Sequence, residues 1–137
     1  MSSRSDGALA PTEKARLVLR IWFSYALVRL RVRREPLPAF VQRLARATRP
    51  TRRRYPPSRL SRAVDRSLRL GARQPTCLVS SLVLFRLLRE QGDRAELVIG
   101  LPHEPVDQDA HAWVEIDGRD VGPPPGRGHH VEMARYP

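Results

Sequence analysis

The chain has 137 residues, of which 41% are hydrophobic, which is enough for one modest core but not for two large ones. Its single cysteine excludes an internal disulfide and a cysteine-rich zinc module, and it favours a reducing compartment, so we expect a cytoplasmic protein. No stretch reaches the roughly 18 uninterrupted apolar residues that suggest a membrane span, and the first dozen residues contain no apolar run suited to a signal peptide.

The formal net charge is +11, and the basic side is almost purely arginine because Lys14 is the one lysine. An arginine skew of this kind also follows from codon composition in a G+C-rich genome. No helix-turn-helix, RRM or zinc-finger signature accompanies the charge, so we do not expect nucleic-acid binding. The charge does favour acidic partners, such as an acidic peptide, an acidic protein or an anionic membrane surface.

The N-terminal region, residues 1–58, is expected to be basic and helical and to end in a Pro-punctuated linker. Residues 12–34 predict one long helix with Thr12 as its N-cap. Four arginines of this helix share one narrow wedge with Ser24, namely Arg16, Arg20, Arg31 and Arg34. Apolar side chains fill much of the remaining circumference, so the helix needs cover on more than one side. We expect that cover from this chain, with a partner protein or peripheral contact with a membrane as the alternative.

Two shorter helices are expected next, from Pro38 to Arg46 and over residues 58–70, where a glycine ends the second one. A fourth helix follows over residues 76–92, with Thr76 as N-cap immediately before Cys77. Because this fourth helix is apolar along most of its length, we expect it to be buried at the centre of the fold.

The rest of the chain predicts an antiparallel sheet. Two strand-like runs occupy residues 94–101 and 109–116, and the dipeptide Asp117–Gly118 that follows is typical of a hairpin turn. Residues 119–122 are therefore expected to return as a third strand, and the tail after them is expected to be irregular. This order predicts an α+β fold in which a central helix packs on a small antiparallel sheet.

Cys77 and His111 are the candidates for nucleophilic chemistry. N–H groups and the helix dipole at the start of a helix favour the thiolate of a cysteine there, although a lone cysteine is also often a small apolar core residue. His111 begins an alternating run in which His111, Trp113 and Glu115 point to one face, and a single histidine there is as readily structural. Together, the two residues match the core of thiol catalysis.

A metal site is the competing interpretation, because His103, His111, His129 and His130 accompany Cys77. Their spacing fits no zinc pattern, and the adjacent pair of histidines in a Pro/Gly-rich tail is typical of a solvent-exposed segment. We therefore expect no metal and no other cofactor.

The segment PTCLVSSLVLFRLLREQGDRAELVIGL, followed by DAHAWVEIDGRDV, resembles the transglutaminase-like superfamily and, more specifically, the leader-peptidase proteins of lasso-peptide biosynthesis. In that family a Cys-Leu pair opens the helix, and a strand carries His-Ala-Trp-Val-Glu before an acidic-Gly turn. The resemblance implies a papain-like core over residues 59–137, after the helical region 1–58. It also implies a cysteine peptidase that removes the leader from a ribosomally made precursor peptide.

The resemblance implies a Cys-His-Asp triad, with Cys77 as nucleophile and His111 as general base. The acidic residue expected about a dozen positions after the histidine is replaced by Pro123. Asp120 is the nearest carboxylate on the return strand, but a two-residue turn before it would place it opposite Glu115 unless a bulge intervenes. Asp109 is its rival, and an incomplete triad is a third alternative.

Two further site residues follow from the same resemblance. The backbone N–H of Cys77 and the side chain of Gln74 are implied as donors to the oxyanion, and Trp113 is implied as a wall of the cleft. The alternatives are a solvated glutamine before a proline and an ordinary core tryptophan.

The arginine-rich helical first half, together with a missing recognition domain, resembles the split version of these peptidases. The implied partners are the leader of the precursor, a separate leader-recognition protein and the ring-closing enzyme that receives the freed core. We expect the basic linker and first helix to form the docking surface for the leader and its recognition protein. Acyl transfer to an amine by the same site, and a non-catalytic basic binding protein, are the alternative functions.

Overall fold

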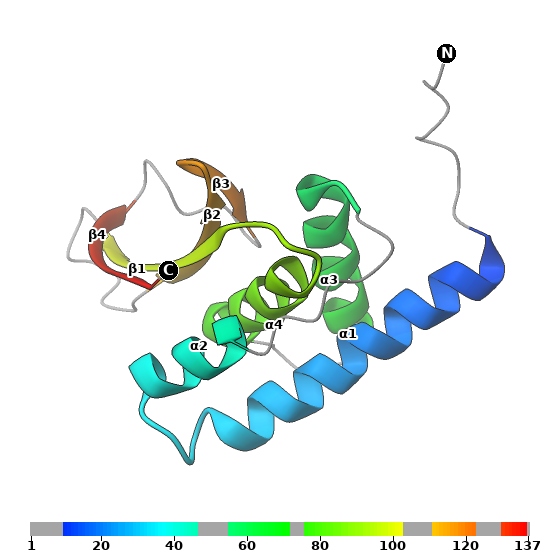
Figure 1. Ribbon diagram of the computed structural model, residues 1–137, viewed down its shortest axis with the longest axis horizontal. Helices are drawn as coiled ribbons and strands as arrows, with labels where there is room; N and C mark the ends of the chain where they lie inside the picture. Colours follow the sequence, from blue (N-terminus) through cyan, green and yellow to red (C-terminus); the bar gives the residue numbers. More distant parts are fainter. Residues whose placement is uncertain (1–9, 47–54, 72–75, 103–110, 123–129, 137) are drawn as a thin grey trace.

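The computed structural model describes residues 10–46, 55–71, 76–102, 111–122 and 130–136. These ranges form four helices and one four-stranded antiparallel sheet, so the predicted α+β class is confirmed (Figure 1). In chain order the elements are α1 (Pro11–Arg31), α2 (Leu37–Arg46), α3 (Pro57–Gly71), α4 (Cys77–Glu90), β1 (Ala95–Pro102), β2 (His111–Ile116), β3 (Arg119–Gly122) and β4 (His130–Tyr136).

Helix α4 lies at the centre of the molecule, as its apolar sequence predicts. It packs on β1 and β2 on one side and on α1, α2 and α3 on the others (Figure 1). Every helix contributes side chains to the same hydrophobic core, which includes Ile21, Phe40, Leu68, Leu82, Phe85, Leu97 and Val114. The core is therefore shared between the two regions of the sequence, and the expected boundary between residues 58 and 59 stays a prediction.

Helix α1 differs from its prediction at the N-terminus. The helix begins at Pro11, with Ala10 rather than Thr12 as the N-cap, because the fixed φ of proline suits the first helical position. Ser24, which shares the wedge of arginines, is fully buried, and its hydroxyl accepts a hydrogen bond of 2.6 Å from Nη1 of Arg86. A partner of this kind lets a polar residue of the wedge lie in the interior, because the buried hydroxyl is hydrogen-bonded.

The predicted hairpin between β2 and β3 is confirmed. Asp117 and Gly118 have φ angles of 51° and 77°, and Ile116 pairs with Arg119, so the turn contains two residues. Positive φ at both central positions is the geometry whose twist matches that of the flanking strands.

The C-terminal tail is the main correction to the predicted fold. Residues 130–136 were expected to be irregular, but they form β4, which pairs antiparallel with β1 and completes the sheet order β3-β2-β1-β4. The Pro/Gly-rich segment before β4 dominated the prediction, whereas the residues of β4 contain neither proline nor glycine. Pairing with β4 supplies partners for the backbone groups along one side of β1, which a strand needs when it is buried.

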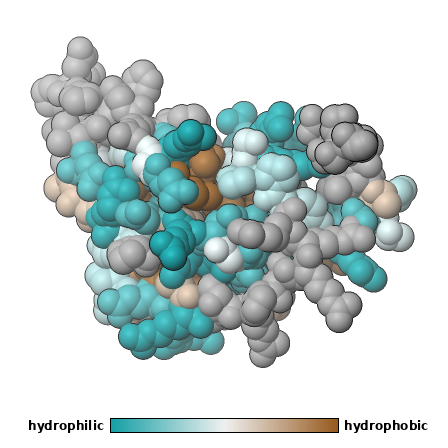
Figure 2. Space-filling view, turned by 45° about the horizontal axis from the view of Figure 1, so that its top comes forward, coloured by the Kyte–Doolittle hydropathy of each residue, from teal (hydrophilic) through white to brown (hydrophobic). Residues whose placement is uncertain are grey.

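None of the described helices is both long enough and apolar enough to cross a membrane. The face of the molecule in Figure 2 is mostly hydrophilic, with a few small hydrophobic patches. This surface agrees with the high proportion of arginine in the chain.

Candidate active site

Cys77 is the first residue of α4, as predicted. Thr76 has extended backbone angles and caps the helix, and its Oγ1 accepts a hydrogen bond of 3.2 Å from the backbone N–H of Val79. The N–H groups of a first helical turn point out of the helix and carry the positive end of its dipole. The thiol is half-buried and is not part of a disulfide. The sulfur therefore lies where a helix terminus favours negative charge.

A buried hydrogen bond joins the helix of Cys77 to the strand of His111. The Oγ of Ser81, which is fully buried in α4, donates to the carbonyl oxygen of Ala112 in β2 at 2.9 Å. Ser81 lies one helical turn after Cys77, and Ala112 is the residue after His111. The bond thus holds together the start of α4 and the start of β2, where the predicted nucleophile and base lie.

The side chain of His111 belongs to one continuous row on β2. Its ring stacks on Trp113 with 5.9 Å between the centroids, and Nε1 of Trp113 donates to Oε2 of Glu115 at 2.8 Å. These contacts confirm that the three side chains share a face, whereas Val114 and Ile116 alternate to the side that packs against the helices. Trp113 is only 2% exposed, so the indole is a core side chain that supports the imidazole.

Glu115 extends the same row to β4. Glu115 is 3% exposed, and its Oε1 accepts a hydrogen bond of 3.1 Å from Nη2 of Arg135. Arg135 also binds Glu132 at 2.6 Å and Glu96 at 3.1 Å. The hydrogen bond that Arg135 donates to Glu132, followed by the contacts with Glu96 and Glu115, raises the pKa of Arg135 above its ordinary value against the opposing effect of partial burial. The guanidinium therefore stays charged, and it joins Glu96 and Glu132 to Glu115, the carboxylate that accepts the N–H of Trp113.

Asp120 lies opposite Glu115, as a two-residue turn predicts. The pairing shifts by a bulge between Glu115 and Val114, and Oδ1 of Asp120 accepts a hydrogen bond of 2.8 Å from the backbone N–H of Gly122. The residue directly across from Asp120 is four positions along β2 from His111, which is about 13 Å at roughly 3.3 Å per residue. The structure therefore does not bring Asp120 next to the predicted base, and its role in a triad stays a prediction.

Several predicted residues lie outside the described part of the chain: Gln74, His103, Asp109, Pro123 and His129. His130 begins β4. Within the described ranges, no group of three or more histidine, cysteine, aspartate or glutamate side chains is arranged to hold a metal ion.

Two residues that support the site were not found from the sequence. Ser81 carried a usable signal, because a polar residue four positions after a helical nucleophile lies on the same face as that nucleophile. Arg135 lies in the segment that was expected to be irregular, so its contact with Glu115 across β1 had no signal at the sequence level.

The family comparison supports the resemblance to the transglutaminase-like superfamily. A family model described as the transglutaminase-like superfamily matches residues 17–134, a span that includes most of α1 and extends into β4. The searches of curated proteins and of solved structures gave no match. The superfamily generally contains Cys-His-Asp enzymes of the cysteine peptidase and acyltransferase type. The model matches well over half of the chain, and this protein therefore belongs to the transglutaminase-like superfamily.

Proposed function

We propose that this protein is a cytoplasmic cysteine peptidase that removes the leader from a ribosomally made precursor peptide of the lasso type. The observation that carries the proposal is the position of Cys77 at the capped start of α4, packed on the strand that begins with His111. Membership of the transglutaminase-like superfamily supports a thiol enzyme. The leader-peptide substrate and the separate leader-recognition protein follow from the sequence resemblance.

The row of His111 lies on the face of β2 away from the helices, but His111 is the first residue of that strand, so the proposed reaction has its imidazole reach the Cys77 thiol around the start of β2. His111 then takes the proton of the thiol, and the sulfur attacks the carbonyl carbon at the leader–core junction. The developing oxyanion accepts a hydrogen bond from the backbone N–H of Cys77, at the positive end of α4. His111 then gives its proton to the leaving amine of the core, and the leader remains as a thioester on the sulfur. Water, deprotonated by His111, releases the leader as a free acid and restores the thiol.

The test is mass spectrometry of a co-encoded precursor, mixed with this protein and its recognition partner. Wild type should produce a leader and a core whose masses sum to the precursor plus one water, whereas Cys77→Ala and His111→Ala should leave the precursor intact. Ser80→Ala changes another residue of α4 and serves as the matched control that should still cleave. Intact precursor with wild type, while the recognition protein demonstrably binds the peptide, would reject the proposal.

Two further readouts separate the alternatives. Added hydroxylamine would compete with water for the thioester. If low concentrations of hydroxylamine already convert most of the leader to its hydroxamate, acyl transfer is the main reaction. Iodoacetamide tests the non-catalytic binding protein, because an activated Cys77 reacts near neutral pH faster than an ordinary thiol, whose pKa is about 8.5, and because His111→Ala should slow that reaction.

A further inference from the structure

Helix α1 carries two apolar stripes on opposite sides. One stripe is buried against α3 and α4 and contains Leu17, Ile21 and Val28. The other points to solvent: Leu19, Phe23 and Leu30 are 68%, 64% and 55% exposed, and the smaller Ala26 between them is also exposed. Exposure of this kind on three large apolar side chains of one helix is unusual for a surface that stays in water.

The exposed stripe has the spacing of a helix-packing seam. Its members, Leu19, Phe23, Ala26 and Leu30, follow one another at steps of four, three and four residues. At about 100° per residue, they fall within a wedge of roughly 60° that lies opposite the buried stripe. Alternating steps of three and four place apolar side chains where a second helix interlocks with the first. In Figure 1, α1 runs along the edge of the molecule, with α3 and α4 on its inner side.

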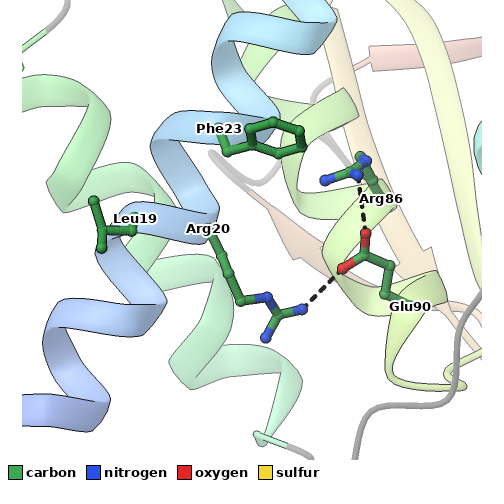
Figure 3. Close-up of a pocket in the computed structure, with 5 residues that line it drawn as sticks. All are labelled: Leu19, Arg20, Phe23, Arg86 and Glu90. Atoms are coloured by element: carbon green, nitrogen blue, oxygen red, sulfur yellow. Dashed lines mark hydrogen bonds and ion pairs between the residues drawn. The ribbon is translucent and has the colours of Figure 1, made fainter.

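A shallow hollow between α1 and α4 adjoins this seam. Leu19, Arg20, Phe23, Arg86 and Glu90 line it (Figure 3). Arg20 and Arg86 share the carboxylate of Glu90, at 2.9 and 3.2 Å, and the guanidinium of Arg86 lies 5.5 Å from the ring centroid of Phe23. Two guanidinium groups against one carboxylate leave one positive charge beside the apolar seam.

The charge of α1 indicates what covers the seam. The helix has five basic residues and one acidic residue, Glu13, so its side chains sum to 5 − 1 = +4; the basic residues are Lys14, Arg16, Arg20, Arg29 and Arg31. Exposed Arg16 and Arg29 lie on the two sides of the seam. A second copy of this chain would bring one basic helix against another, which like-charge repulsion opposes. An acidic partner gains attraction along the whole helix.

We infer that the outer face of α1 docks an amphipathic helix of a partner protein, with an apolar seam against Leu19, Phe23, Ala26 and Leu30 and acidic residues on both flanks. The seam is one side chain wide, which fits a helix better than the broad apolar face that a membrane surface receives. None of these residues belongs to the Cys77 site, so the inference stands independently of the proposed function.

The test uses a labelled synthetic peptide of about four heptads with leucine at the a and d positions and glutamate at both e and g. Glutamate on both flanks keeps the peptide from pairing with itself. Wild type should bind it, with affinity that falls as salt rises, and Leu19→Ser/Phe23→Ser should bind at least about tenfold more weakly. The matched control Leu70→Ser/Met133→Ser removes two exposed apolar residues elsewhere, which are 83% and 63% exposed, and should bind as wild type does.

Three outcomes would overturn the inference. One is equal binding of the peptide by wild type and by Leu19→Ser/Phe23→Ser, with circular dichroism showing the variant folded. The second is equal binding of a peptide with lysine in place of glutamate. The third is a wild-type protein that does not bind the peptide but shows another interaction that Leu19→Ser/Phe23→Ser loses. Self-association lost in this way would assign the face to a second copy, and binding to phosphatidylserine vesicles lost in this way would assign it to a membrane.

Discussion

The indole of Trp113 lies nearly parallel to the imidazole of His111, with 24° between the ring planes and 5.9 Å between their centroids. The indole is itself fixed through its N–H by Glu115, and Glu115 is fixed by Arg135 from the far strand of the sheet. We interpret this row as the support that sets the orientation of the proposed base. A stacked ring restricts how the imidazole turns, and the buried ion pair restricts how the indole moves.

Glu115→Leu should slow the reaction of Cys77 by about tenfold or more, because the indole loses its acceptor and the stacked imidazole loses its orientation. Glu115→Gln keeps an acceptor for the indole and should stay within about threefold of wild type. The measurement is the rate of iodoacetamide alkylation against pH. Glu96→Leu is the matched control, since Glu96 also binds Arg135 but lies on β1. An equal loss in both leucine variants would assign Glu115 to stability alone.

Arg135→Met should lower the free energy of unfolding by about 3 kcal/mol, because it leaves the buried carboxylate of Glu115 without its cation. Urea denaturation measures the change, and Arg119→Met, at an exposed position of β3, is the control with an expected effect under about 0.5 kcal/mol.

The pKa of Arg135 is raised, so the stabilisation from its ion pair is fully present below the pKa that Arg135 has in the unfolded chain, and it is lost only as pH rises through the pKa in the folded protein. Both values lie above the usual range of measurement, so the difference from wild type should not change through titration of Arg135 between about pH 6 and 9. A difference near zero would show that the ion pair is not needed.

Ser81→Ala should destabilise the protein by about 1–3 kcal/mol, because it removes the buried donor to the carbonyl of Ala112. The same variant should slow alkylation of Cys77, since the bond holds the start of α4 against the start of β2. Ser80→Ala, on the same helix, provides the comparison for loss of a hydroxyl at the neighbouring position. Unchanged unfolding and alkylation in Ser81→Ala would mean that packing of the two elements suffices without this bond.

Thr76→Val should cost about 1 kcal/mol of stability, because valine has nearly the shape of threonine but cannot accept the N–H of Val79. Thr76→Ser keeps the accepting oxygen and should restore most of the loss. Thermal unfolding of the three proteins measures the effect. If the valine and serine variants unfold alike, the cap contributes little to α4.

The sequence predicted the parts of the fold that local rules determine. The cap at Thr76 and the turn at Asp117–Gly118 depend on neighbouring residues, and both were located correctly. The burial of Ser24 depends on Arg86, 62 residues away, and β4 depends on an edge of β1 that only the folded sheet creates. Periodicity does not carry such information. For the same reason, Cys77 and His111 were found as candidates from sequence, whereas the Arg135 support was not.

The role of Asp120 can be decided because asparagine preserves its local hydrogen bond. In Asp120→Asn the amide oxygen can still accept the N–H of Gly122, so the bulge should survive while the negative charge is lost. Because the register places Asp120 about 13 Å along β2 from His111, we expect this variant to remove the leader within about tenfold of the wild-type rate. A loss of about 10⁴-fold would instead identify Asp120 as the residue that orients the base. Asp109→Asn, measured in parallel, tests the rival carboxylate, and a large loss there alone would assign the third member of the triad to Asp109.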